Sequence, residues 1–102
     1  MSKNIDGGAV NPQHILDTVT LKVAKTLLEN PTIQYNQSTL AEAADVSRDA
    51  LLRRWDTLTE IGLLQKADVE SSIDHWKLNS DSEIANTLSK LIYTICSEGE
   101  NQ

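Results

Sequence analysis

The sequence predicts a mainly α-helical domain with one small β-hairpin, an α+β arrangement, and three observations lead to this expectation. Apolar residues recur at spacings of three and four in several segments, as they do on the buried face of a helix. Helix-capping residues stand directly before those segments. Two short alternating runs, 63–69 and 72–78, precede the last helical segment. With 102 residues in all, these elements are expected to form one domain.

The first helix is expected within a domain that spans residues 11–98, after a disordered tail at 1–10 and before a short tail at 99–102. Asn11–Pro12 is typical of a helix start, and Asn30–Pro31 of a helix end. A run of β-branched residues at 18–20 allows a break in between.

Two more helices are expected after a short β-prone stretch at 32–35. Asn36 should cap the first of them, over 37–44, and Ser47 should cap the second, which runs to about Glu60. In this third helix the spacing i, i+4, i+7 predicts a buried stripe, followed by a glycine terminator. The stripe is Leu51, Trp55 and Leu58, and the terminator is Gly62.

The last helix is expected from a capping box at Ser80–Glu83 to about Glu98, where Gly99 should end it. Its apolar face is wider than one stripe, with a main row and flanking residues that include Cys96. The main row is Ile84, Leu88, Leu91 and Ile95, flanked by Ala85 and Ile92. A face of this width can serve both the core and a second copy of the chain, so we expect a homodimer through about 80–98. The residues expected at that interface are Ile84, Leu88, Leu91, Ile92 and Ile95.

Two helices joined by a tight turn and followed by a hairpin are the order of a winged helix-turn-helix. The segment STLAEAADVSRDALLRRWDTLTEIGLL (38–64) resembles the core of the MarR- and ArsR-like transcriptional regulators. The likeness is greatest to the short single-domain versions of halophilic archaea. WKLNSDSEIANTLSKL (76–91) is similar to the way such proteins pass from the wing into a C-terminal helix. The resemblance implies a sequence-specific DNA-binding regulator, and a repressor in particular.

All the arginine of this acidic chain, whose net charge is −6, lies at Arg48, Arg53 and Arg54. The third helix of a helix-turn-helix enters the major groove, and the buried stripe places these arginines on its outward half or flank. Arginine can fork onto guanine or hold phosphate, a leucine suits a thymine methyl, and an aspartate can accept from cytosine. The plainer alternative for Asp49 is an intrahelical ion pair with Arg53 or Arg54.

The predicted DNA contacts fall into three groups. Helix N-termini supply amides and hydroxyls for phosphate, the third helix supplies base contacts, and the wing supplies two lysines. The set is Gln37, Ser38, Ser47, Arg48, Asp49, Leu52, Arg53, Arg54, Lys66 and Lys77. The wing tip at 68–72 departs from the family pattern because it carries acid rather than base. A dimer would hold two recognition helices about 34 Å apart, which matches a palindromic operator in double-stranded DNA.

Other classes of function find little support in the sequence. No nucleophile–base constellation or phosphate-binding loop points to an enzyme, and His14 and His75 have no second ligand at metal spacing. We therefore expect no cofactor and no metal, and a small effector could bind only at the dimer interface. The lone Cys96 and the lack of a long apolar run predict a cytoplasmic protein without a membrane span. The alternative reading is a winged-helix module for protein interaction, or an accessory plasmid, virus or chromatin protein.

Overall fold

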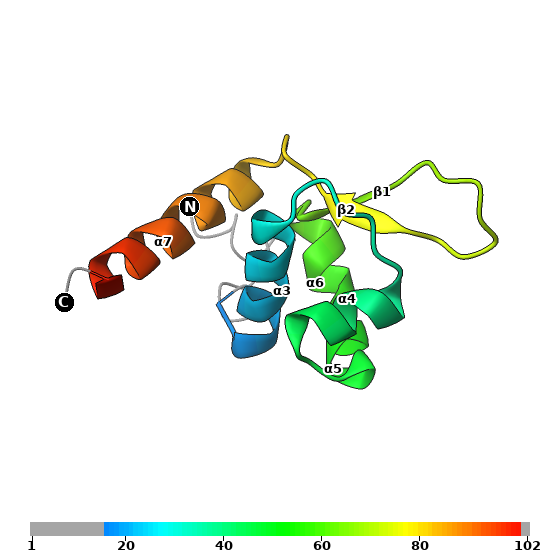
Figure 1. Cartoon of the computed structure of the whole chain (residues 1–102), viewed down its shortest axis with the longest axis horizontal. Coiled ribbons are helices and arrows are strands. Elements are labelled where there is room, and N and C mark those ends of the chain that lie inside the picture. The colour runs from blue at the N-terminus through cyan, green and yellow to red at the C-terminus, as the bar shows by residue number, and fades with distance from the viewer. Residues whose placement is uncertain (1–15, 101–102) are drawn as a thin grey trace, which may run out of the picture.

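The computed structural model describes residues 16–100 of the chain, and the side chains of 16–97. The elements follow the expected order of helices, hairpin and final helix, so the predicted fold class is confirmed. They are α3 (Thr18–Glu29), α4 (Gln37–Ala44), α5 (Arg48–Arg53), α6 (Trp55–Glu60), β1 (Leu64–Lys66), β2 (Trp76–Leu78) and α7 (Glu83–Glu100). In Figure 1 the hairpin loop extends to one side of the helical cluster, and α7 runs out on the other.

Helix α3 begins at Thr18 because Asp17 caps it, with Asp17 Oδ1 accepting from the Thr20 amide at 2.7 Å. The β-branched residues 18–20, where the sequence allows a break, instead form the first turn of this helix. The helix ends at Glu29, before Asn30, as predicted. The start predicted at Asn11–Pro12 lies outside the described residues.

Helices α4 and α5 form the helix-turn-helix, and both predicted caps are present. Asn36 Oδ1 accepts from the Thr39 amide at 2.8 Å, and the Asn36 amide donates to Thr39 Oγ1 at 3.0 Å. Ser47 Oγ accepts from the Ala50 amide at 3.0 Å. Between them Asp45 takes a left-handed conformation, with φ 59°, which reverses the chain within three residues. This turn fixes the angle at which α5 leaves α4.

The predicted third helix is divided, which corrects the expectation of one helix from Arg48 to about Glu60. Arg54 has φ −102° and ψ 3°, and its amide donates to the Leu51 carbonyl rather than one residue further back. Its side chain reaches Asp17, an ion pair that sequence spacing does not reveal. The apolar spacing survives the break, since Leu51 and Leu58 are both fully buried.

Of the predicted buried stripe, Trp55 is only half buried, whereas Leu51 and Leu58 are fully buried. The Trp55 ring meets the edge of Trp76 from the hairpin, with ring centroids 5.2 Å apart and planes at 83°. Both rings pack against a core of aliphatic side chains from the helices and the start of the hairpin. The largest fully buried apolar side chains of that core are Val23, Leu27, Leu40, Leu51, Leu58 and Leu63.

The predicted hairpin is present, with shorter strands than the alternating runs. Strands β1 and β2 pair antiparallel, with Leu64 opposite Leu78 and Lys66 opposite Trp76. Tyr35, from the β-prone stretch, adds a bridge to Trp76 through two backbone hydrogen bonds of 2.7 Å. The hairpin is therefore tied to the chain segment that enters α4.

Both ends of α7 differ from the prediction. The cap is Ser82 rather than Ser80: Ser82 Oγ accepts from the Ala85 amide at 3.1 Å and donates to the Ile61 carbonyl at 2.9 Å. The helix also runs through Gly99 to Glu100, since a glycine inside a helix costs only about 1 kcal/mol and does not forbid it. Gly62, at φ +74°, does end α6 in the left-handed conformation that was expected.

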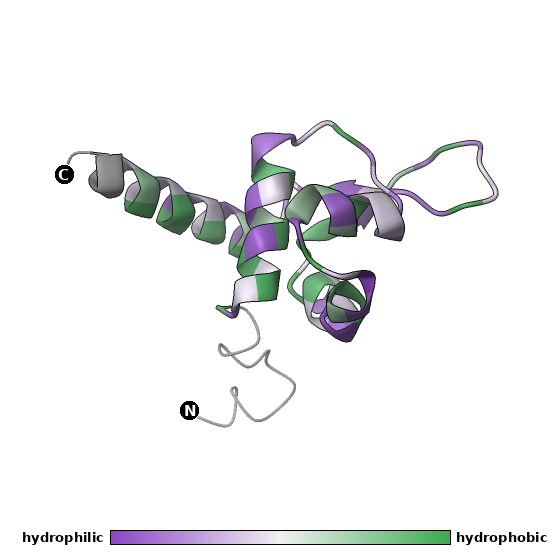
Figure 2. Ribbon diagram, turned by 60° about the horizontal axis from the view of Figure 1, so that its bottom comes forward, coloured by the Kyte–Doolittle hydropathy of each residue, from purple (hydrophilic) through white to green (hydrophobic). Residues whose placement is uncertain are grey.

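The apolar face of α7 divides into a buried row and an exposed row, as its width predicts, but Leu88 of the predicted main row lies in the buried one. Ala85 and Leu88 are buried at 2% and 4% exposure, and Ile92 packs partly against the same core. Ile84, Leu91 and Ile95 remain exposed at 39%, 44% and 60%. Leu88 therefore packs inside the single chain, and the exposed row lacks it. Figure 2 shows hydrophobic segments continuing along α7 where it leaves the other helices.

Candidate nucleic-acid interface

The outward face of α5 carries the side chains that the sequence predicted there. Arg48, Asp49 and Arg53 are exposed, and Leu52 is 42% exposed. Leu51 points the opposite way into the core, which fixes the rotation of the helix. The face therefore presents two guanidinium groups, a carboxylate and an isobutyl group to solvent.

Asp49 forms the intrahelical pair that was the plainer alternative for it. Its Oδ2 lies 2.8 Å from Nη2 of Arg53, one helical turn later, and both side chains are about three-quarters exposed. The other candidate partner, Arg54, turns away from Asp49. The carboxylate is thus held beside one of the two outward arginines.

Arg54, which the sequence places at the flank of the outward face, forms an ion pair with the start of α3 that the sequence did not predict. Its Nε donates to Asp17 Oδ2 at the start of α3, and the two side chains are 35% and 21% exposed. Partial burial raises the pKa of Asp17, but hydrogen bonds from Thr20 and Arg54 outweigh it, so the pKa lies below its ordinary value. This ion pair joins α3 to the junction of α5 and α6.

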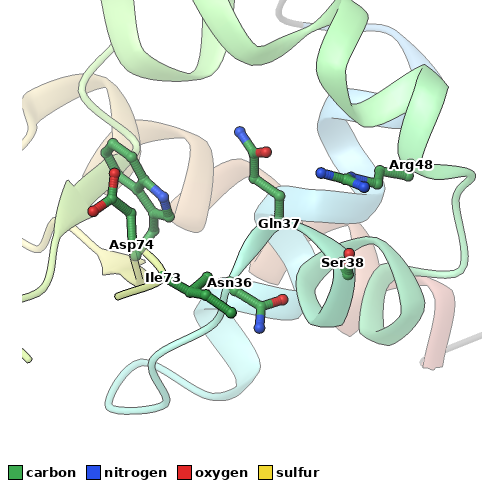
Figure 3. A pocket seen from close by; sticks show the side chains of 7 residues that line it. Asn36, Gln37, Ser38, Arg48, Ile73 and Asp74 are labelled. Atoms are coloured by element: carbon green, nitrogen blue, oxygen red, sulfur yellow. The ribbon is translucent and has the colours of Figure 1, made fainter. Parts of the chain in front are cut away.

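A cleft of about 410 Å³ opens between the start of α4, the start of α5 and the hairpin. It is lined by Asn36, Gln37, Ser38, Arg48, Ile73, Asp74 and Trp76. Figure 3 shows the Gln37 amide and the Arg48 guanidinium extending into the same space, with Asp74 across from them. Three residues of the predicted DNA-contact set, Gln37, Ser38 and Arg48, therefore line the same cleft. Ser47 stays outside the cleft, where its hydroxyl is used as the cap of α5.

The hairpin side of this cleft was not found from the sequence. Ile73, Asp74 and Trp76 are far from Gln37 and Arg48 in the chain. The bridge between Tyr35 and Trp76 and the ring contact between Trp55 and Trp76 hold the hairpin beside the helices. The alternating pattern predicts the hairpin itself, but no pattern in the sequence predicts that it packs beside the starts of α4 and α5.

The two wing lysines do not form one patch. Lys66 lies opposite Trp76, whereas Lys77 lies opposite Gln65, so the two side chains point to opposite faces of the hairpin. Lys66 Nζ lies 3.3 Å from Asp74 Oδ1, and Lys77 is half buried. At most one of them can face the same surface as the cleft.

Within residues 16–100, no three side chains gather as a group that could hold a metal ion. The same stretch contains no helix with the length and apolar character needed to cross a membrane.

The helix-turn-helix, the hairpin packed beside it and the cleft between them define a winged helix-turn-helix fold. Solved structures share this fold. The antimony-specific transcriptional repressor AntR is 16% identical with TM-score 0.68, covering 100% of this chain and 87% of its own. HlyU from Vibrio cholerae is 22% identical with TM-score 0.65, covering 94% and 99%.

A possible transcriptional regulator from Methanosarcina mazei is 18% identical with TM-score 0.59, covering 88% of this chain and 78% of its own. At these identities the likeness is one of fold. No protein-family model matches the sequence, and no curated protein matches it either.

Proposed function

We propose that this chain is a sequence-specific DNA-binding transcriptional regulator that places α5 in the major groove. The observation that carries the proposal is the outward face of α5, where Arg48, Leu52 and Arg53 are exposed and Arg48 also lines the cleft. The fold agrees, since AntR is described as a transcriptional repressor and the Methanosarcina protein as a possible regulator. A repressor that occupies promoter DNA is the simplest form of this activity.

Each side chain of the face has a defined task in this proposal. Arg48 and Arg53 fork onto guanine edges or hold phosphates, and Leu52 contacts a thymine methyl. Gln37, Ser38 and Ser47 contact the phosphate backbone, which passes along the cleft. Arg54 has no direct task at the DNA, because Asp17 holds it against α3.

The proposed active form is a homodimer through the exposed row of α7. The row consists of Ile84, Leu91 and Ile95, which are 39%, 44% and 60% exposed. Next to the row, a wholly apolar groove of about 230 Å³ is lined by Leu16, Leu21, Lys25, Leu91, Ile92, Ile95 and Cys96. A second copy related by a twofold axis would cover both, and would present two α5 helices to a palindromic site.

The test is capture of sheared genomic DNA on the purified protein, followed by sequencing of the bound fragments. An enriched palindrome is expected, and Arg48→Gln should weaken binding of that fragment by about 10-fold or more. Lys90→Gln removes the same charge from α7 and serves as the matched control. Failure to enrich any fragment, together with a protein that co-purifies, would instead favour a protein-interaction module.

A further inference from the structure

Two carboxylates of the candidate interface each form an ion pair with one of its cations. Asp49 holds Arg53 at 2.8 Å on α5, and Asp74 holds Lys66 at 3.3 Å across the hairpin. Asp74 also lines the cleft that Arg48 lines. Every side chain of these two pairs is more than half exposed, so water and salt reach both pairs freely.

In the part of the chain that the structure describes, Arg48 differs from Arg53 and Lys66 in having no carboxylate partner. Among the ion pairs formed within residues 16–100, none includes Arg48, whereas Arg53 and Lys66 each have a carboxylate in reach. A phosphate that approaches Arg53 or Lys66 must displace that carboxylate or lie beside it. Either event reduces the attraction between the protein and the DNA backbone.

We propose that Asp49 and Asp74 act as built-in competitors of phosphate, which suppress binding to DNA of arbitrary sequence. The inference rests on the proposed function and adds a regulation of its affinity. Binding to arbitrary DNA is driven almost entirely by phosphate contacts, so it loses most when cations are already paired. Base contacts by Arg48 and Leu52, which belong to neither pair, add free energy at a cognate site that the pairs do not reduce.

The experiment compares Asp49→Asn with Glu29→Gln in the full chain. Glu29 is a matched control, because it also pairs with a cation one helical turn away at 2.8 Å, on α3 and outside the cleft. Each change removes one negative charge and keeps the shape of the side chain. The probe is a mixed-sequence DNA duplex, titrated by fluorescence anisotropy over a range of salt concentrations.

Asp49→Asn should tighten binding of the mixed-sequence duplex by about 3- to 10-fold, and should steepen the plot of log affinity against log salt by about 0.9. Asp74→Asn should act in the same direction through Lys66. Glu29→Gln should change the affinity by less than about 2-fold, since its cation lies away from the DNA. Thermal unfolding of all three variants checks that the fold is kept.

Equal effects of Asp49→Asn and Glu29→Gln would overturn the inference, because net charge alone would then explain them. Weaker binding by Asp49→Asn would also overturn it, since Asp49 would then itself contact the DNA favourably. If no genomic fragment is enriched, and neither the unaltered protein nor Asp49→Asn binds the mixed-sequence duplex even at low salt, the proposed function fails. If the protein binds and Arg48→Gln weakens it, only the role of the carboxylates is in question.

Discussion

The outward face of α5 and the outer row of α7 are both exposed in the single chain, but they differ in polarity. The outward face of α5 is charged, and its arginine and aspartate satisfy each other at 2.8 Å. The outer row of α7 is apolar, with Leu91 and Ile95 at 44% and 60% exposure. Water solvates the first surface at little cost, whereas the second gains free energy whenever it is covered.

This difference indicates two kinds of contact. A charged face that is already solvated suits a reversible, salt-dependent contact with a polyanion. An apolar row suits a lasting contact with another apolar surface.

The largest effect is expected at the apolar row. Leu91→Glu combined with Ile95→Glu should convert a dimer into monomers at micromolar concentration. Burial of each such side chain contributes about 1.5–3 kcal/mol, and a twofold interface counts each one twice, so the dissociation constant should rise more than about 100-fold. Sedimentation velocity measures the change. Ile33→Glu, at a residue of similar exposure before the hairpin bridge, should leave the dimer intact. An unaltered protein that sediments as a monomer would contradict the dimer.

The next effect separates two neighbouring arginines. Arg53→Gln should weaken DNA binding by about 1–3 kcal/mol, with the free energy of unfolding nearly unchanged, because Arg53 is exposed on the charged face. Arg54→Gln should mainly lower the free energy of unfolding, because it loses its contact with Asp17. Mobility shift and urea denaturation on both variants check the contrast. The reverse pattern would mean that Arg54, rather than Arg53, faces the DNA.

A smaller effect is expected at Asp17, which both caps α3 and holds Arg54. Asp17→Ala should lower the free energy of unfolding by about 1–2 kcal/mol, most of it from the lost cap. Urea denaturation measures this loss, and Asp17→Asn, which keeps an oxygen for the Thr20 amide, should lose less.

The same aspartate predicts a dependence on pH. The pKa of Asp17 is lower in the folded chain than its ordinary value of 3.8. The stabilisation is therefore present above about that pH, and it is lost as pH falls through the lowered pKa. The difference between the unaltered protein and Asp17→Asn should shrink in this acid range. A difference that stays constant down to the acid limit would contradict the assignment.

The smallest effect is expected at Ser82, which connects the start of α7 to the end of α6. Ser82→Ala removes the acceptor for the Ala85 amide and the donor to the Ile61 carbonyl, and should cost about 1 kcal/mol. Ser80→Ala is the matched control, because the structure gives the cap to Ser82. Equal losses in both variants, by urea denaturation, would return the cap to Ser80.

Much of the fold follows from local patterns in the sequence. Asn36 and Ser47 cap their helices as expected, because a cap depends only on residues within one turn. The alternation that predicts the hairpin also gives its two faces, and Gly62 ends α6 in the expected conformation. The outward position of Arg48 and Arg53 follows from the periodicity that buries Leu51.

The contacts that the sequence did not reveal all join residues far apart in the chain. Asp17 forms an ion pair with Arg54, the residue at which the predicted third helix divides into α5 and α6. The apolar spacing continues through this residue and gives no sign of the division. Tyr35 reaches Trp76 and brings Asp74 to the cleft. Helix α3 and the core cover Leu88 and leave Leu91 exposed, although both lie on the same broad apolar face.

The sequence by itself determined the order of the elements, the caps of α4 and α5 and the charged face of α5, because each depends on spacing within a few residues. The tertiary structure alone decided which arginine is held against α3 by an ion pair, and which carboxylate of the hairpin approaches the interface. It also decided which row of α7 is left for a partner. Those outcomes depend on where elements dock, and the docking is set by packing between segments that no local pattern brings together.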